Sequence, residues 1–478
     1  MSFLFAALLT CVSGLGLLRA LRLSTGRVAV DLPLAWLAGG AWFAAAAFSI
    51  RSLLGLRVNL PIAAAVLAVP VVAWGILRRA RPGVAVPAAA AGDGVRWVPR
   101  PAWLFAPMAA WLVVVVAAVS LHAMSTPTHT DDGYRVRAYA PILAAEGAWS
   151  GSARDVLIMA GPIPSFVPAI AWVLGSPVDP FHVNVAIVLT FLALLALLVG
   201  LGSERGRPEA GWGAVFALTS VPFLAYHVTS TYSDAWLAMY LAAAFAYLVA
   251  YGQGHEPADA GRALLLLVGA AMVKREGELV ALPVIGVLLA QVWRMEGVRG
   301  LLRGAPLLAA YGVVVAARIA AVGLPGAFPF LRAAAQRSSE VGRAASEVAA
   351  VASPGASGEP AAGALFADAL FREGNLGLLY WVLALAVLAL LPRIRKDGLA
   401  WSGLALGLVL AETAASAIWL YPQFTLDGST VHRSLLPVSA AASVWLAALL
   451  VAASRPAPAP APAAAPARRA RRRSSKPG

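Results

Sequence analysis

The chain has 478 residues, of which 60% are hydrophobic and only 13% are charged, and this balance excludes a string of soluble domains. The formal charge of +14 would suit a nucleic-acid-binding protein, but the Lys and Arg residues lie mostly in short segments beside apolar stretches, where they indicate membrane orientation. We therefore expect an integral membrane protein that sits in the lipid bilayer and does not bind nucleic acid.

Thirteen apolar segments follow one another along the chain. Most are long enough to cross about 30 Å of hydrocarbon, and each should be a helix, because a backbone in lipid must satisfy its own hydrogen bonds. The segments cover residues 2–18, 32–50, 60–77, 103–121, 181–200, 212–227, 234–251, 263–273, 279–293, 305–322, 376–391, 399–420 and 435–453. The sequence therefore predicts an all-α polytopic membrane protein with about 13 transmembrane helices.

The flanks of the first segment suggest how the protein lies in the membrane. Residues 2–18 have no basic region before them and are followed by Arg19, Arg22 and Arg27, which is not the pattern of a cleaved signal peptide. If the N-terminus is outside, 24 of the 37 Lys and Arg residues are inside and 12 are outside. Because Lys and Arg favour the cytoplasmic side, we expect a multi-pass protein of the cytoplasmic (inner) membrane with its N-terminus outside.

Three regions are expected along the chain. Residues 1–102 form an N-terminal three-span region with a cytoplasmic linker, and residues 103–453 form the main membrane domain. Residues 454–478 form a disordered cytoplasmic tail, rich first in Ala and Pro and then in Arg.

Two long loops, at 122–180 and 323–375, should lie outside, and loops of this length are usually functional or disordered. The first should fold into short surface helices, and the second should hold an interfacial helix at 330–351 followed by a mobile lid. Asp131 and Asp132 lie near the start of the first loop. Adjacent carboxylates raise one pKa of the pair, so either could act as a general base, although Asp-Asp-Gly is also an ordinary turn or helix cap.

Two further charged turns are expected outside. Asp234 lies at a turn between two spans, and Lys274, Arg275 and Glu276 lie at the turn between the two shortest apolar segments. Short paired helices with a charged turn indicate a re-entrant hairpin, two helices that dip into an outside cavity, or simply a polar turn. Lys and Arg at such a depth are suited to hold a phosphate, because both donate charge-assisted hydrogen bonds.

Two charged residues lie inside apolar segments. Arg318 and Glu412 are each about thirteen residues from the inside end of their span, so at ~1.5 Å per residue both reach a similar depth. An isolated charge there costs at least about 2.5 kcal/mol, so each needs a partner or water. We expect Arg318 and Glu412 to form a structural intramembrane pair; the alternative is that both point separately into a substrate cavity.

The order and sidedness of these features resemble a known family of enzymes. The acidic pair, the Pro-rich stretch at 161–164, Tyr-Ser-Asp at 232–234, Lys-Arg-Glu-Gly at 274–277 and His-Arg-Ser-Leu-Leu-Pro at 432–437 are similar to motifs of the GT-C glycosyltransferases. Within that superfamily the chain is most similar to glycosyltransferase family 39, the group of protein O-mannosyltransferases and aminoarabinose transferases. The similarity covers residues 103–303 and, more loosely, the last span. It departs from the family at the acidic pair, which is often Asp-Glu.

The resemblance implies a GT-C-like core with short outside helices, and an enzyme that moves a sugar from a polyprenyl-phosphate donor to a lipid, glycan or protein acceptor of the cell envelope. Asp131 or Asp132 would be the catalytic base. The candidate substrate-binding residues are Asp234, Lys274, Arg275, Glu276 and Arg433. Because these cations can neutralise the departing phosphate, we expect no cofactor, and a divalent metal is possible without being required.

Two other functions compete with this hypothesis. A polytopic transporter or lipid flippase is expected to show inverted repeats, with helices broken at corresponding positions of two halves, and the sequence shows no such symmetry. A polysaccharide polymerase or ligase would favour Arg and His pairs in the long loops over an acidic pair.

Overall fold

The structure is a computed structural model of the chain, and it describes residues 3–80, 96–99, 101–125, 162–174, 179, 181–230, 232–323, 362–376, 378–416 and 429–454. Within these residues the regular elements are all helices, and no β-strand is present. Nine helices are long and apolar enough to cross a membrane, or ten if one bent pair is a single span. The chain is therefore an all-α, multi-pass membrane protein, as its composition predicts.

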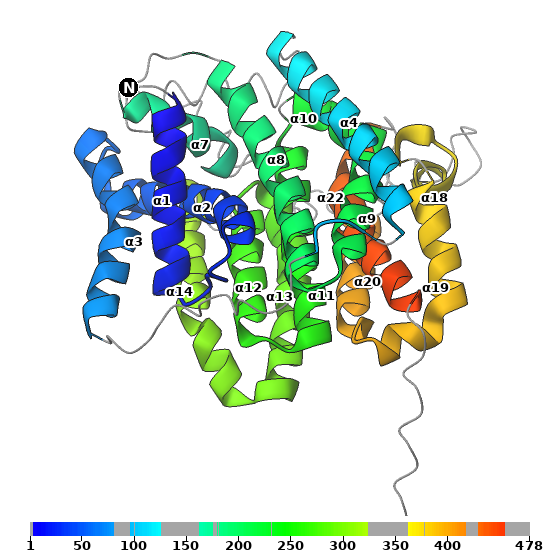
Figure 1. Ribbon diagram of the computed structural model, residues 1–478. Helices are drawn as coiled ribbons and strands as arrows, with labels where there is room; N and C mark the ends of the chain where they lie inside the picture. Colours follow the sequence, from blue (N-terminus) through cyan, green and yellow to red (C-terminus); the bar gives the residue numbers. More distant parts are fainter. Residues whose placement is uncertain are drawn as a thin grey trace, which may run out of the picture.

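The helices form one bundle, with α1 and α3 on one flank and α18 and α19 on the other (Figure 1). The full-length helices are α1 (Phe3–Ala20), α2 (Val28–Leu54), α3 (Leu60–Ala80), α4 (Phe105–Ser125), α8 (Phe181–Glu204), α11 (Ser233–Gly254), α13 (Arg275–Glu296), α14 (Val298–Val322) and α22 (Ser429–Ala453). The others are α7 (Pro162–Val173), α9 (Pro208–Thr219), α10 (Pro222–Thr229), α12 (Pro257–Ala271), α18 (Ala362–Phe371), α19 (Leu379–Lys396) and α20 (Ala400–Ala415), with the short turns η1 (Ala102–Leu104) and η2 (Gly374–Leu376).

Helix α11 is the centre of the bundle. It is buried along almost its whole length and packs against α22, α12 and α8. Its residues are apolar or small on nearly every face, and a helix that is hydrophobic all round has to be buried. The first turn of this central helix is where Asp234 lies.

Helices α1 and α2 approach each other closely through two glycines. A Cβ atom at Gly14 would overlap the carbonyl oxygen of Ala35, and one at Gly39 would overlap that of Thr10. Small residues allow membrane helices to pack backbone against backbone, so both positions need Gly. Helix α2 also packs against α7, α8 and α14 and joins the first three helices to the rest of the bundle.

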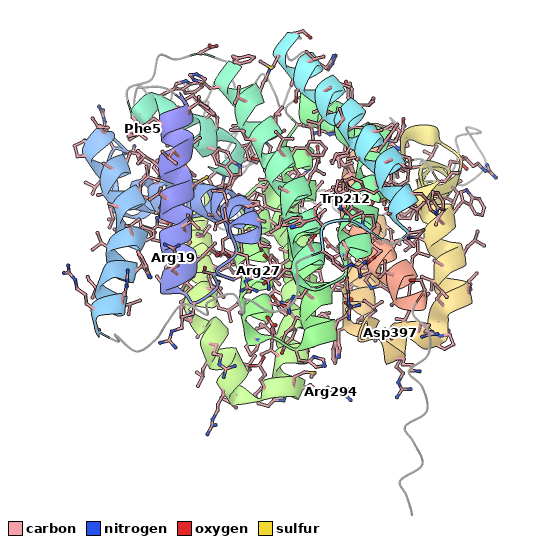
Figure 2. The ribbon with its side chains drawn as sticks, in the orientation of Figure 1. Phe5, Arg19, Arg27, Trp212, Arg294 and Asp397 are labelled. Atoms are coloured by element: carbon pink, nitrogen blue, oxygen red, sulfur yellow. The ribbon has the colours of Figure 1, made fainter. Side chains whose placement is uncertain are left out.

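The bundle has two distinct ends. Phe3 stacks on His182 at 4.8 Å between ring centroids, and Asn184 donates a hydrogen bond to the Ala123 carbonyl, so α1 and α8 begin where α4 ends. We call this end, which also holds the first turns of α11 and α22, the Asp234 end. The opposite end holds the last turns of α8, α11 and α13, and we call it the Arg294 end. Figure 2 shows Arg294 and Asp397 together at that end and Phe5 at the other.

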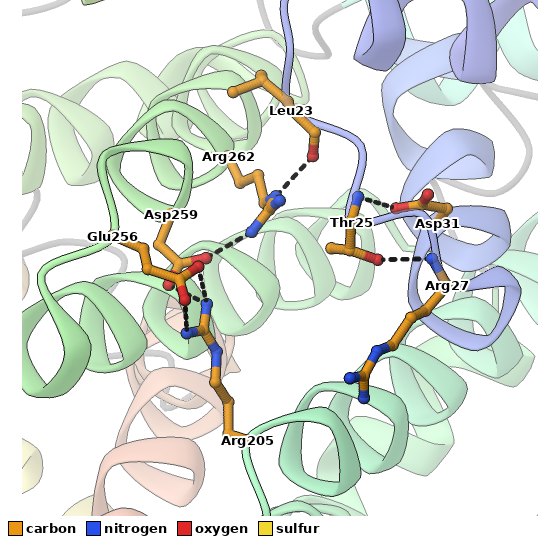
Figure 3. A network of polar contacts seen from close by, with 8 residues as sticks. All are labelled: Leu23, Thr25, Arg27, Asp31, Arg205, Glu256, Asp259 and Arg262. Atoms are coloured by element: carbon orange, nitrogen blue, oxygen red, sulfur yellow. Dashed lines mark hydrogen bonds and ion pairs between the residues drawn. The ribbon is translucent and has the colours of Figure 1, made fainter. Parts of the chain in front are cut away.

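A buried polar network joins three segments at the Arg294 end (Figure 3). Asp259, which is fully buried, forms ion pairs with Arg205 and Arg262, and Arg205 also pairs with Glu256 at 2.7 Å. The Arg262 Nε donates to the Leu23 carbonyl at 2.6 Å. Because a buried carboxylate requires such compensation, these contacts hold α8, the α11–α12 turn and the α1–α2 loop in place.

Nine of the thirteen expected spans are full-length helices, and the other four are not confirmed as spans by the described residues. Residues 212–227 do not form one straight helix: α9 and α10 meet at an angle of 72°, because Pro222 cannot continue a helix and the preceding Val221 is extended. The other three differ in length or in regularity: α12 has 15 residues, α20 has 16, and α19 is kinked at Leu390, two residues before Pro392.

The long loops are only partly described. Their described parts include α7, which was expected to be a surface helix but is buried and packs against α2. Its apolar residues Ile163, Val167 and Ile170 are each at most 5% exposed, so it belongs to the core. The expected interfacial helix and lid, at 330–351 and beyond, and the tail after residue 454 lie outside the described residues.

The expected pairing of Arg318 with Glu412 was also wrong. Arg318 forms an ion pair with Glu278, and both side chains are buried. Residue counting gives the depth of a side chain but not the side of the helix on which it lies. Helix α14 packs against α2, α12 and α13, so Arg318 meets Glu278 in the first turn of α13. The Oε2 atom of Glu412 has no hydrogen-bond partner among the described residues.

A double-mutant cycle should distinguish the two pairings. Arg318→Leu and Glu278→Leu should each lower the free energy of unfolding, and the double variant should lose less than the sum, with an interaction energy of about 0.5–3 kcal/mol. Unfolding in mixed micelles measures these values. Glu412→Leu is the matched control, and its effect should add to that of Arg318→Leu; coupling with Glu412 alone would contradict the observed pair.

Candidate active site

Asp234 is the centre of the most strongly charged cluster at the Asp234 end. It lies in the first turn of α11, and its carboxylate is completely buried. The positive end of the helix dipole favours a carboxylate there, but a buried anion also needs direct partners. Two cations provide them: Lys274 binds Oδ1, and the Arg433 Nε donates to Oδ2 at 3.0 Å.

Lys274 is positioned by the turn between α12 and α13. It is the N-cap residue of α13, and its side chain is 12% exposed. The turn is tight, because a Cβ at Gly277 would overlap the Ala270 carbonyl, and the Ile163 N–H of α7 donates to the Met272 carbonyl. Burial lowers the pKa of Lys274, but the negative charges of Asp234 and Glu276 raise it more, so the ammonium stays charged.

Arg433 reaches the cluster from α22. Its guanidinium lies 4.6 Å from the centre of the Tyr232 ring, within the range of a cation–π contact, and its side chain is 32% exposed. Tyr232 is the N-cap residue of α11, so the same turn supplies both the aromatic ring and the Asp234 carboxylate. Three helices that are distant in the sequence therefore converge on one carboxylate.

Two histidines lie beside this cluster. His227 of α10 is buried, makes an edge contact with Tyr232 at 4.5 Å between ring centroids, and packs against Phe223. Phe223 also contacts His432, whose Nε2 binds the carboxylate of Glu373 just after α18. Neither histidine was a predicted site residue; the available signal was that His432 directly precedes Arg433 in the sequence.

The structure brings together three of the candidate substrate-binding residues and places a fourth beside them. Asp234, Lys274 and Arg433 are in direct contact, and a Glu276 oxygen lies 3.9 Å from the Lys274 Nζ. Asp131 and Asp132 lie outside the described residues, as does the side chain of Arg275.

The charges of this cluster suit it to bind an anion. Lys274 and Arg433 place two positive charges around the buried carboxylate of Asp234, and both cations are partly exposed. The Glu276 carboxylate beside Lys274 is more exposed, at 43%. Such an arrangement can accept an anionic group such as a phosphate. Among the described residues no group of three or more His, Cys, Asp or Glu side chains is arranged to hold a metal ion.

The fold and the cluster define a multi-pass membrane protein with a cationic site at one end of its central helix. Comparison with protein-family models, with curated proteins and with solved structures finds no match to this chain.

Proposed function

We propose that this protein is a membrane glycosyltransferase that moves a sugar from a polyprenyl-phosphate donor to a lipid, glycan or protein acceptor of the cell envelope. The observation that supports this function best is the convergence of Lys274 and Arg433 on Asp234 at the end of the central helix. Sugar transfer from a lipid phosphate needs positive charge where the phosphate departs, and these two cations provide it.

Each residue has a separate role in the proposed reaction. The acceptor hydroxyl attacks the anomeric carbon, the bond from that carbon to the phosphate oxygen breaks, and the phosphate leaves with the bonding electrons. Asp131 or Asp132 takes the proton of the hydroxyl. Lys274 and Arg433, assisted by Arg275, balance the charge on the leaving phosphate, while Asp234 holds the two cations in position. This mechanism requires no metal, although a divalent cation could assist it.

The Asp234 end is proposed to face outside the cytoplasmic membrane. The last turns of α1, α3, α13 and α19 carry seven Lys and Arg residues and lie toward the other end: Arg19, Arg78, Arg79, Arg294, Arg393, Arg395 and Lys396. Since basic residues favour the cytoplasmic side, this distribution supports an inside Arg294 end.

Cysteine labelling should reveal this orientation. In a Cys11→Ser background, Ser125→Cys at the Asp234 end should react with a membrane-impermeant maleimide on intact cells, because Ser125 is exposed. Arg299→Cys, at the exposed start of α14, is the matched control and should react only after the membrane is permeabilised. The reverse pattern would exclude both the orientation and an outside site.

The function is tested by transfer with purified protein. Incubation with a radiolabelled polyprenyl-phosphate sugar and a cell-envelope extract should yield a labelled acceptor, and a deletion strain should lack the same sugar on an envelope lipid, glycan or protein. A lipid flippase is the second candidate, favoured by the bent α9–α10 pair, since broken helices are common in transporters. Movement of intact donor across proteoliposomes without sugar transfer would favour the flippase and overturn the enzyme.

A further inference from the structure

Two cavities meet at the Arg294 end of the bundle, opposite the candidate active site. The first has about 680 Å³, including space open to solvent. It lies among α8, α9, α11 and α22 and is lined mainly by small and aliphatic residues such as Ala214, Ala250 and Ala448. We call it the apolar cavity. Its short side chains leave space between the packed helices.

The second cavity has the opposite character. It has about 1300 Å³, including space open to solvent, and Arg207, Arg294, Arg395 and Lys396 line it from three different regions of the chain. We call it the basic cavity. Its one acidic residue is Asp397, so four cations face a single carboxylate. Within the described part of the chain, Arg294, Arg395 and Lys396 form no ion pair with any acidic side chain.

The two cavities share a wall. Arg207 and Gln253 line both of them, and Arg207 donates a hydrogen bond to the Oε1 atom of Gln253. A ligand with a charged head and an apolar chain could therefore place its head among the cations and its chain among the alanines. Neither free phosphate nor a hydrocarbon alone would use both cavities.

Two buried polar atoms of the basic cavity have no hydrogen-bond partner in the described part of the chain. The Oε1 atom of Gln291 and the Oδ2 atom of Asp397 are buried and accept no hydrogen bond from the described residues, and Gln291 is only 1% exposed. A buried acceptor without a donor costs free energy, so a ligand that brings hydroxyl groups would relieve it. The backbones of Gly252 and Gly398, which also line this cavity, are in such close contact that neither position has room for a Cβ.

We propose that these joined cavities bind an anionic phospholipid whose headgroup carries hydroxyl groups, as that of phosphatidylglycerol does. The phosphate lies among Arg207, Arg294, Arg395 and Lys396, the headgroup hydroxyls donate to Gln291 and Asp397, and one acyl chain enters the apolar cavity. Basic pockets between membrane helices on the cytoplasmic side are suited to anionic lipid headgroups. This proposal is independent of the sugar-transfer chemistry at the Asp234 end.

Titration of the purified full-length protein in a nonionic detergent tests the proposal, with binding followed by native mass spectrometry and by the thermal unfolding midpoint. Phosphatidylglycerol should bind at least tenfold more tightly than phosphatidylcholine, and inorganic phosphate should raise the midpoint little. A triple variant should bind phosphatidylglycerol about 100-fold more weakly: Arg294→Gln, Arg395→Gln and Lys396→Gln. Each basic residue is expected to strengthen lipid binding about fivefold. Ala448→Leu, which fills the apolar cavity, should weaken lipid binding without changing the response to inorganic phosphate.

The control variant removes three cations that line neither cavity, Arg78→Gln, Arg79→Gln and Arg299→Gln, and it should bind phosphatidylglycerol like the wild type. Each variant is compared by its unfolding midpoint without lipid, which separates lost binding from lost folding. Equal binding of the two lipids, an equal response to inorganic phosphate, or an equal loss in the control variant would each overturn the proposal.

Discussion

Replacing both Asp131 and Asp132 with Asn is expected to slow sugar transfer by about 10²- to 10⁴-fold while donor binding remains. The acceptor hydroxyl has a pKa far above neutrality, so it needs a positioned base, and an amide cannot accept its proton. Purified variants should be compared for turnover with a polyprenyl-phosphate sugar and for donor affinity. The single Asn variants should show which aspartate is the base, and the larger loss of turnover is expected for Asp131→Asn.

The control for this experiment is Asp179→Asn, which changes another acidic residue of the same long loop. Asp179 is exposed, and its Oδ1 accepts a hydrogen bond from the Phe181 backbone N–H, a role that an Asn side-chain oxygen can also fill. This variant should transfer sugar at the wild-type rate. Wild-type turnover in the Asp131→Asn, Asp132→Asn double variant would show that the acidic pair is structural.

Replacing Lys274 with Met is expected to lower donor affinity by about tenfold to 100-fold, because this is the change in affinity that losing one hydrogen bond to a charged group causes. It also leaves the buried Asp234 with Arg433 as its remaining described ion-pair partner, which should destabilise the fold, because unpairing a buried charge is costly. These two effects have to be separated. Lys274→Arg should restore binding only in part, since a planar guanidinium and a compact ammonium meet phosphate oxygens differently.

The double variant Lys274→Met with Asp234→Asn makes that separation. Removing both charges relieves the unpaired carboxylate, so the unfolding midpoint should rise relative to Lys274→Met alone, while donor binding stays weak. Donor affinity measured beside the unfolding midpoint gives both values. If donor binding recovered together with stability, the Lys274 charge would serve only the fold, and its role in holding phosphate would be wrong.

Composition and hydropathy were sufficient to predict the class of fold but not each helix. The nine full-length helices were predictable because long apolar runs have one stable form in lipid. The break between α9 and α10 was visible as Pro222, but its 72° angle depends on tertiary packing. The partner of Arg318 was predicted wrongly because the position of a residue within an apolar segment gives its depth in the membrane but not which helices are its neighbours.

The candidate site was only partly accessible from the sequence. Lys274 is 40 residues from Asp234 and Arg433 is 199 residues from it, so no local pattern joins the three. Each was predicted separately, because it lies at an expected outside turn or beside the last apolar segment. That Lys274 and Arg433 both bind Asp234 could be learned only from the three-dimensional structure. No local pattern predicts the role of His227, because its place beside Tyr232 depends on the bend between α9 and α10.

Hydrogen bonds from α2 and the α1–α2 loop to the rest of the bundle determine whether the N-terminal helices can be removed. The Tyr240 hydroxyl of α11 donates to the Leu37 carbonyl, the Trp36 indole of α2 donates to Thr190 of α8, and Arg262 of α12 donates to Leu23. Deleting residues 1–102 would leave Tyr240 and Arg262 without these acceptors and Thr190 without this donor, in a bundle interior where lipid cannot replace the lost partners. Although the main membrane domain was expected to begin at residue 103, these contacts make the N-terminal helices part of the same folding unit, so the smallest unit that folds includes them.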